Sequence, residues 1–176
     1  MKKILCVLLV CIVAVFVSGC SILENDNSNV LRIHIRANSN EAIDQLIKYE
    51  VKDKLLGLFS RVMDRVECID DAYKLIKESV FVLEDYANYL LEKFKSGYKA
   101  SVYIAREYFE DKEIDGKLLS AGVYNAVIVR LGKGNGNNWW GLVYPSLSYI
   151  SSGENVDYSN IEYESRIMEI YNSIII

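Results

Sequence analysis

The sequence predicts an α+β domain in which a small antiparallel sheet packs against a long α-helical hairpin. Three observations predict this class. One segment near residue 30 alternates apolar and polar residues, as a half-buried strand does. Two long segments then repeat apolar residues every three or four positions, as amphipathic helices do. Further alternating segments follow, and an order of one strand, two helices and several strands is typical of α+β domains.

Residues 1–19 have the pattern of a signal peptide of the lipoprotein type. Two lysines precede an apolar run at 4–17, which is short for a membrane span. The run ends in V-S-G-C, a sequence similar to a lipoprotein cleavage box, so we expect lipidation of Cys20 and anchoring at a membrane surface. An ordinary cleaved signal and an uncleaved anchor are the alternatives. Residues 20–29 are rich in Asn and Ser and predict a tether.

The predicted domain covers residues 30–150 and begins with a strand at 30–37. Its apolar face is expected to hold Leu31, Ile33 and Ile35, and its polar face Arg32, His34 and Arg36. The polar face has two interpretations. It is either a structural face that is solvated or makes ion pairs with a helix, or a recognition surface for an anionic or hydrogen-bonding partner. Arg106 and Arg130 are candidates to join that face from neighbouring strands.

Two amphipathic helices are predicted after this strand, at 41–66 and 70–95. Asn38 and Glu41 have the spacing of a capping box before the first helix. The expected buried stripe of the first helix is Ile43, Ile47, Val51, Leu55, Leu58, Val62 and Val66; that of the second is Ala72, Leu75, Ile76, Val80, Leu83, Ala87, Leu90 and Phe94. The short connection predicts an antiparallel hairpin.

The second half of the domain reads as strands. Alternation resumes at 98–106, and the charged segment 107–120 is expected to be a loop or an irregular hairpin. Residues 123–131 are apolar on both faces, which predicts a central strand. The C-terminal extension, 151–176, begins with a polar stretch and can form a short amphipathic helix at 161–175, with Ile161, Ile167, Ile170 and Ile174 as its anchors.

A segment rich in Gly and Asn at 132–138 leads into the chain's two tryptophans. The turn predicts that the strand at 123–131 pairs antiparallel with a strand at 139–144. Neighbouring residues of a strand point to opposite faces, so one of Trp139 and Trp140 is expected in the core and the other at a groove or partner surface. The alternative is a loop in which both rings pack down.

Composition and motif spacing exclude several classes of function. The net charge of −4 lacks the basic excess typical of nucleic-acid binders. The single histidine and the cysteine spacing predict no metal site, and the Gly-rich segment lacks the spacing of nucleotide-binding loops, so no cofactor is expected. No catalytic set is recognisable, so we expect no enzyme; a hydrolase using scattered carboxylates is the remaining enzymatic alternative. After removal of the signal, Cys68 is the one thiol besides Cys20.

Four sequence blocks resemble the stage II sporulation protein R family. They are L-R-I-H-I-R-A-N-S at 31–39, R-E at 106–107, A-G-V-Y-N-A at 121–126 and G-K-G-N-G-N-N-W-W at 132–140. The resemblance runs from Leu31 to Pro145. The residues it marks as partner-binding or family signature are Arg32, His34, Asn38, Ser39, Arg106, Glu107, Gly134, Gly136, Asn138, Trp139 and Trp140. Where the family usually has two cysteines, this chain has Gly141 and Ser148, so a disulfide that pairs them in relatives is absent.

The resemblance implies an exported intercellular signal of endospore formation. Such proteins leave the forespore for the intermembrane space, where they activate a membrane-embedded aspartic protease that processes a mother-cell pro-sigma factor. The expected partners are therefore this receptor and a lipid anchor in the membrane of origin, with no nucleic acid and no small-molecule substrate. The alternative function is an envelope lipoprotein with a structural or carbohydrate-binding role, because adjacent tryptophans suit sugar stacking.

Overall fold

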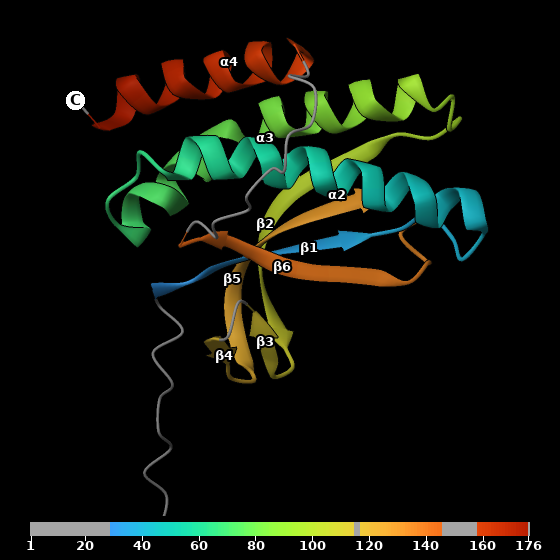
Figure 1. Ribbon diagram of the computed structural model, residues 1–176, viewed down its shortest axis with the longest axis horizontal. Coiled ribbons are helices and arrows are strands. Elements are labelled where there is room, and N and C mark those ends of the chain that lie inside the picture. Colours follow the sequence, from blue (N-terminus) through green and yellow to red (C-terminus); the bar gives the residue numbers. More distant parts are fainter. Residues whose placement is uncertain (1–28, 115–116, 146–157, 176) are drawn as a thin grey trace, which may run out of the picture.

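The computed structural model describes residues 29–114, 117–145 and 158–175 and has three layers. Helices α2 (Ala42–Met63) and α3 (Ile69–Lys93) cover one face of a four-stranded sheet, and α4 (Tyr158–Ile175) packs outside them (Figure 1). A small hairpin lies on the opposite side of the sheet. The α+β class is therefore confirmed. The expected signal peptide, Cys20, Ser148 and the polar stretch from residue 151 lie outside the described residues.

The sheet is mixed, whereas the sequence predicted an antiparallel one. Its order is β2 (Ala100–Phe109), β5 (Gly122–Leu131), β1 (Leu31–Arg36) and β6 (Asn138–Tyr144). The β2–β5 and β1–β6 pairs are antiparallel, but β1 and β5 are parallel. The predicted central position of the strand after residue 122 is confirmed, because β5 has a neighbour on each side.

The predicted pairing of β5 with β6 is wrong, because β1 lies between them. The Gly/Asn segment passes over the end of β1 instead of making a tight hairpin. The backbone N–H groups of Asn135 and Gly136 donate to the carbonyls of Asn38 and Ala37 at 3.2 and 2.9 Å. Strands two places apart are separated by about 10 Å, a distance that six or seven residues span easily.

The helices bury nearly all of the predicted stripes against the upper face of the sheet. α2 and α3 run in opposite directions, as a hairpin does (Figure 1). The core between helices and sheet includes Leu31, Ile33, Ile35, Val51, Leu55, Leu75, Ile76, Leu83, Leu90, Val127 and Val129. Ile43 is an exception, because it is 59% exposed. Asp44, Ile47 and Lys48 face inward at that end of α2, which turns Ile43 toward solvent.

The predicted C-terminal helix is present as α4, and it packs on α3 and α2. Ile167 is buried as expected, and Ile170 and Ile174 are half-buried against the core. Ile161 is 48% exposed and does not anchor the helix. Tyr163 contributes instead, with its ring centroid 4.5 Å from that of Tyr86 on α3. No helix in the described part of the chain is long and apolar enough to cross a membrane.

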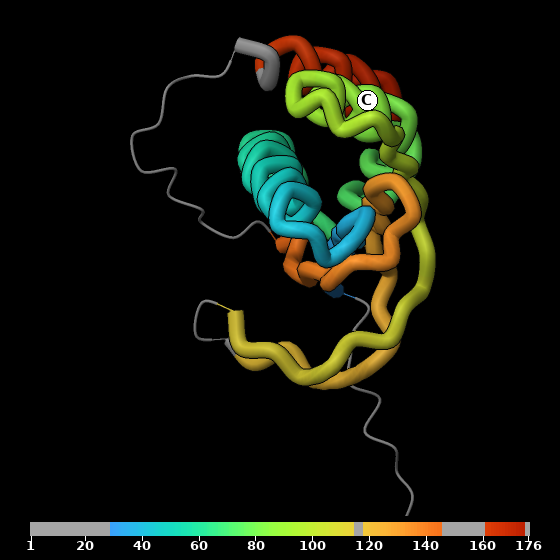
Figure 2. Tube along the Cα trace, turned by 90° about the vertical axis from the view of Figure 1, so that its right-hand side faces the viewer, coloured from blue at the N-terminus to red at the C-terminus, as the bar shows by residue number. Residues whose placement is uncertain are grey.

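The lower face of the sheet is covered, not solvated. β2 and β5 extend beyond the start of β1 and curve beneath the sheet into the hairpin of β3 (Lys112–Ile114) and β4 (Lys117–Leu119), as Figure 2 shows. This confirms the expected hairpin. A second apolar cluster lies here and contains Val30, Phe109, Leu119, Tyr124, Ala126, Ile128 and Leu142. Consequently the predicted polar face of β1 is buried, with Arg32 only 1% and His34 only 5% exposed.

Candidate functional site

A closed hydrogen-bond network, which we call the Asp44 clamp, lies at the C-terminal end of β1. The Asp44 carboxylate accepts hydrogen bonds from Asn38 Nδ2 at 2.8 Å, Ser39 Oγ at 2.6 Å and the Tyr98 hydroxyl at 2.7 Å. Burial by itself favours the protonated acid, but these three bonds outweigh it and hold the pKa of Asp44 below its ordinary value. Burial and the Asp44 charge raise the pKa of Tyr98, so its hydroxyl stays a donor.

The Asp44 clamp also holds the Gly/Asn segment. Asn38 Oδ1 accepts from the Lys133 N–H at 3.0 Å, and Asn40 Oδ1 accepts from the Asn137 N–H at 2.7 Å. The expected capping box is absent, because Glu41 makes no side-chain cap and the Asn38 side chain is committed to Asp44 and Lys133. Two signature blocks that lie nearly a hundred residues apart therefore form one structural unit.

Glycine is required at both signature glycines of the Gly/Asn segment, Gly134 and Gly136. A Cβ on Gly136 would overlap the backbone carbonyl of Ser39, which cannot move without breaking the turn. Gly134 has a φ of +67°, and a Cβ there would lie 2.7 Å from Arg130 Cγ. These two signature glycines therefore shape the loop.

Lys48 links the Gly/Asn segment to α2 through hydrogen bonds. Its side chain is 1% exposed, and Nζ donates to Gln45 Oε1 at 2.8 Å and to the Asn137 carbonyl at 3.2 Å. Gln45 in turn donates to the Ser39 carbonyl at 2.8 Å. Lys48 is among the residues that resemble the family's first helix, but helical periodicity does not predict its burial, since a lysine is almost never fully buried unless it is paired.

The two tryptophans lie on opposite faces of β6, as strand geometry predicted. Trp139 is half-buried on the helix side, where its indole lies over Gly141. The Lys52 ammonium of α2 lies 5.6 Å from the centre of that ring. Trp140 faces the lower side and is 40% exposed, with its ring centroid 5.3 Å from that of His34. A cysteine side chain at position 141 would therefore compete with Trp139 for the same space.

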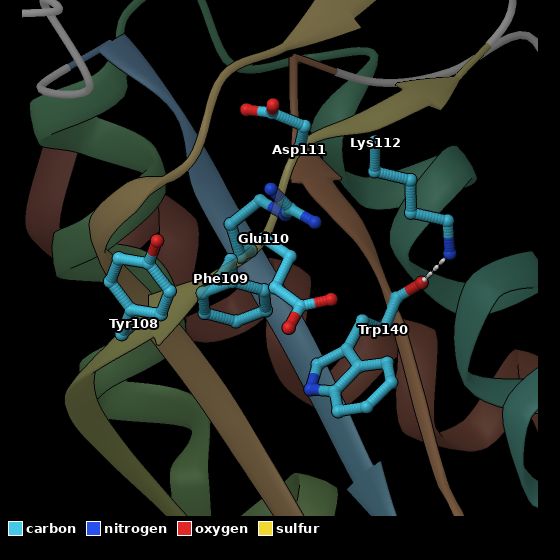
Figure 3. Close-up of a pocket in the computed structure, with 7 residues that line it drawn as sticks. Tyr108, Phe109, Glu110, Asp111, Lys112 and Trp140 are labelled. Atoms are coloured by element: carbon cyan, nitrogen blue, oxygen red, sulfur yellow. Dashed lines mark hydrogen bonds between the residues drawn. The ribbon is translucent and has the colours of Figure 1, made fainter.

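A pocket of about 340 Å³, which we call the Arg32 pocket, opens on the lower side near the start of β1. It is lined by Arg32, Tyr108, Phe109, Glu110, Asp111, Lys112 and Trp140. Figure 3 shows Tyr108 and Phe109 at the end of β2 and Glu110 and Asp111 just after it, while Lys112 reaches the Trp140 carbonyl on β6. That Lys112–Trp140 hydrogen bond is 2.6 Å long.

Arg32 forms the floor of this pocket. Nε donates to the Gly141 carbonyl at 2.9 Å, and the guanidinium lies 4.3 Å from the Phe109 ring centre and 5.0 Å from that of Tyr124. Nη1 is buried and has no hydrogen-bond partner among the described residues. Burial lowers the pKa of Arg32, because the charged form is deprived of water. The site therefore holds a desolvated cation with an open donor.

His34 and Arg36 share one carboxylate on the lower face. Glu107 Oε2 lies 2.6 Å from His34 Nδ1, and Arg36 Nη2 donates to Glu107 Oε1. His34 Nε2 has no partner within the described part of the chain. The polar face of β1 is therefore neither solvated nor paired with a helix, because it is buried and Glu107 of β2 bonds to both His34 and Arg36.

Of the other candidates, Arg130 and Asn138 lie beside Arg36 as its partners on β5 and β6, whereas Arg106 does not join this face. Arg106 is exposed and occupies the alternate position on β2 from Glu107, so it points away from β1's lower face. Asn138 is exposed at the start of β6. Cys68 is a free, exposed thiol before α3. Among the described residues, no group of three or more His, Cys, Asp or Glu side chains is placed to hold a metal ion.

The fold and these two regions define a small α+β domain with a family signature concentrated around β1, and comparison with known proteins places it among sporulation proteins. Residues 27–154 match the family described as Stage II sporulation protein R. The chain therefore belongs to the Stage II sporulation protein R family and has a role in sporulation.

A curated relative supports this assignment. The Stage II sporulation protein R of Bacillus subtilis (strain 168) is 28% identical over 128 residues, which cover 72% of this chain and 57% of the relative. The chain thus spans a little over half the length of that protein. No solved structure matches the chain.

Proposed function

We propose that the protein is an exported signal of endospore formation that activates a membrane-embedded aspartic protease. It would act in the intermembrane space of the forespore, and the protease would then process a mother-cell pro-sigma factor. Membership in the Stage II sporulation protein R family supports this proposal. The signal-like residues 1–19 and the expected lipidation at Cys20 are consistent with export and tethering.

The observation that carries the proposal is the surface around Trp140. An aromatic ring that is 40% exposed lies beside a pocket with a desolvated arginine, on the side of the sheet that the helices leave open. Aromatic and arginine side chains of this kind are typical anchors of protein interfaces. A signal without chemistry of its own activates a receptor by binding its active state more tightly than its inactive one.

Processing of the pro-sigma factor in sporulating cells tests this function. The gene is deleted and complemented with wild type, Trp140→Ala or Phe81→Ala, and the precursor is followed by immunoblot. Phe81 is the control, because it is an aromatic residue of α3 that is 59% exposed. We expect wild type and Phe81→Ala to restore cleavage, and Trp140→Ala to leave uncleaved precursor although the protein accumulates normally.

Two results would contradict this proposal at different levels. Cleavage in the deletion strain itself would remove the signalling role. Full cleavage with Trp140→Ala would keep the role but place the contact surface elsewhere. Lipid tethering has its own test, which is incorporation of a labelled fatty acid that a Cys20→Ala change abolishes.

The alternative, an envelope lipoprotein that binds carbohydrate, rests on a different arrangement of the tryptophans. Sugar stacking on both rings needs them on one surface, but Trp139 and Trp140 lie on opposite faces of β6. Trp140 alone beside the Arg32 pocket is the remaining stacking surface. Sedimentation of the protein with purified peptidoglycan, lost on Trp140→Ala, would favour this function over signalling.

A further inference from the structure

We propose that the Arg32 pocket binds a carboxylate, with the Arg32 guanidinium and the Lys112 ammonium as its donors. The aromatic side chains of Tyr108, Phe109 and Trp140 would hold the apolar group that carries the carboxylate. This inference concerns the chemistry of the ligand, and its test does not depend on the signalling function proposed above.

The hydrogen bonds of Arg32 are incomplete. A guanidinium has five N–H donors in a planar fork, and it is normally buried only with a charged or polar partner. Nε is satisfied by the Gly141 carbonyl, which holds the side chain in place, while Nη1 is buried without a partner among the described residues. A buried donor left without an acceptor costs free energy, and a ligand oxygen in the pocket would remove that cost.

Lys112 adds a second positive charge to the Arg32 pocket. Its ammonium is half-buried and donates to the Trp140 carbonyl, a neutral acceptor. Desolvation and the nearby Arg32 charge both lower the pKa of Lys112. Neither Arg32 nor Lys112 takes part in an ion pair in the described part of the chain. Two cations that repel each other in one pocket favour an anion between them.

The charges and the shape of the Arg32 pocket favour a carboxylate over other anions. Glu110 and Asp111 also line the pocket, and Asp111 Oδ1 accepts from the Ala121 N–H at the entrance to β5. Their charges offset much of the positive potential, so a dianionic phosphate would be repelled more than a monoanion. The planar fork of arginine also matches the two oxygens of a carboxylate. Three aromatic walls suit a carboxylate attached to an apolar group, as at a peptide C-terminus or on a glutamate side chain.

The test uses the full chain in a non-ionic detergent, labelled with ¹⁵N-tryptophan. The two indole N–H signals report two sites on β6, because Trp140 lines the pocket, whereas Trp139 packs on the helix side with the Lys112 ammonium 5.6 Å from its ring centre. The probes are N-acetyl-phenylalanine, its amide, N-acetyl-glutamate amide and inorganic phosphate. The first and third distinguish a terminal carboxylate from a side-chain carboxylate, and binding of either supports the proposal.

We expect a carboxylate probe to shift the Trp140 signal saturably, with a Kd of about 1 mM or lower. The amide of N-acetyl-phenylalanine should bind at least about tenfold more weakly than the acid, the equivalent of one charge-assisted hydrogen bond. Lys112→Gln should weaken the acid by a similar factor, whereas Lys133→Gln, at an exposed lysine of the Gly/Asn segment, should leave it unchanged. Arg32→Lys keeps the charge but removes the fork and should also weaken binding.

Three results would overturn the proposal. One is equal binding of the acid and its amide, which would make the pocket merely apolar. Another is phosphate binding as tight as that of the carboxylates, which would make it a general anion site. The third is the absence of a saturable shift by about 10 mM, where a ligand with a Kd of about 1 mM would be about nine-tenths bound. Lys112→Gln keeps the test valid even if Arg32→Lys fails to fold.

Discussion

The two ends of β1 carry buried charges that are treated in opposite ways. At the C-terminal end, the Asp44 carboxylate has three donors, and Lys48 has two acceptors. Near the N-terminal end, Arg32 bonds to the Gly141 carbonyl and to the Tyr124 side chain, and its buried Nη1 has no partner among the described residues. A strand of six residues, about 20 Å long, therefore joins a closed network to an open one. The comparison separates a charge whose hydrogen bonds the fold itself supplies, Asp44, from one that keeps a donor for the ligand we propose, Arg32.

The largest effect is expected from removing the centre of the closed network. Asp44→Ala leaves the donors of Asn38, Ser39 and Tyr98 without their acceptor and should lower the free energy of unfolding by about 3 kcal/mol. Urea denaturation measures it, with Asp53→Ala on the exposed side of the same helix as the control. A loss below about 1 kcal/mol would mean that the Asp44 clamp does not hold the loop.

The next effect comes from the loop that the Asp44 clamp holds. Gly136→Ala forces the new Cβ against the Ser39 carbonyl and should cost about 2 kcal/mol in stability. Gly57→Ala, inside α2 with its nearest neighbour at 3.8 Å from the new Cβ, should instead stabilise by about 0.5 kcal/mol. Thermal unfolding of both variants measures this contrast. If Gly136→Ala and Gly57→Ala changed the stability by the same amount and in the same direction, the loop would not be packed closely on β1.

Lys48 and Lys112 allow the most direct comparison between the two ends of β1. Lys48→Met removes the donor that satisfies Gln45 and the Asn137 carbonyl, and it should cost about 1.5 kcal/mol. Lys112→Met removes a half-buried ammonium that makes no ion pair among the described residues, so stability should change by no more than about 0.5 kcal/mol. Chemical denaturation distinguishes them, and a larger loss at Lys112 would make its role structural.

The smallest effect is expected in the pH dependence of stability that arises from Asp44 at the C-terminal end of β1. The pKa of Asp44 is lower in the folded state than in the unfolded chain, where it is about 3.9. Its contribution to stability is therefore complete above about pH 5 and is lost as pH falls through the unfolded and then the folded pKa. Between about pH 5 and pH 3, wild type should lose more stability than Asp44→Asn. Parallel acid denaturation curves would show that Asp44 is not the group responsible.

Sequence patterns predicted local features well because their causes are local. Alternation along 31–36 indicated a strand, and the apolar stripes indicated both long helices. The opposite orientation of Trp139 and Trp140 also follows from the geometry of a strand. The predicted stripe failed at Ile43, where the inward residues of α2 are Asp44 and Lys48. Their burial depends on partners about 50 and 90 residues away, which helical periodicity does not report.

The sequence by itself determined the α+β class, the order of the elements and the family signature, since these depend on residue periodicity and on short motifs. Only the tertiary structure decided that β1 enters between β5 and β6, that its polar face is buried beneath the curved ends of β2 and β5, and that Arg32 lacks a full set of acceptors. The reason is that strand order and burial arise from contacts between distant segments, and the same alternating pattern fits a solvated face and a covered one.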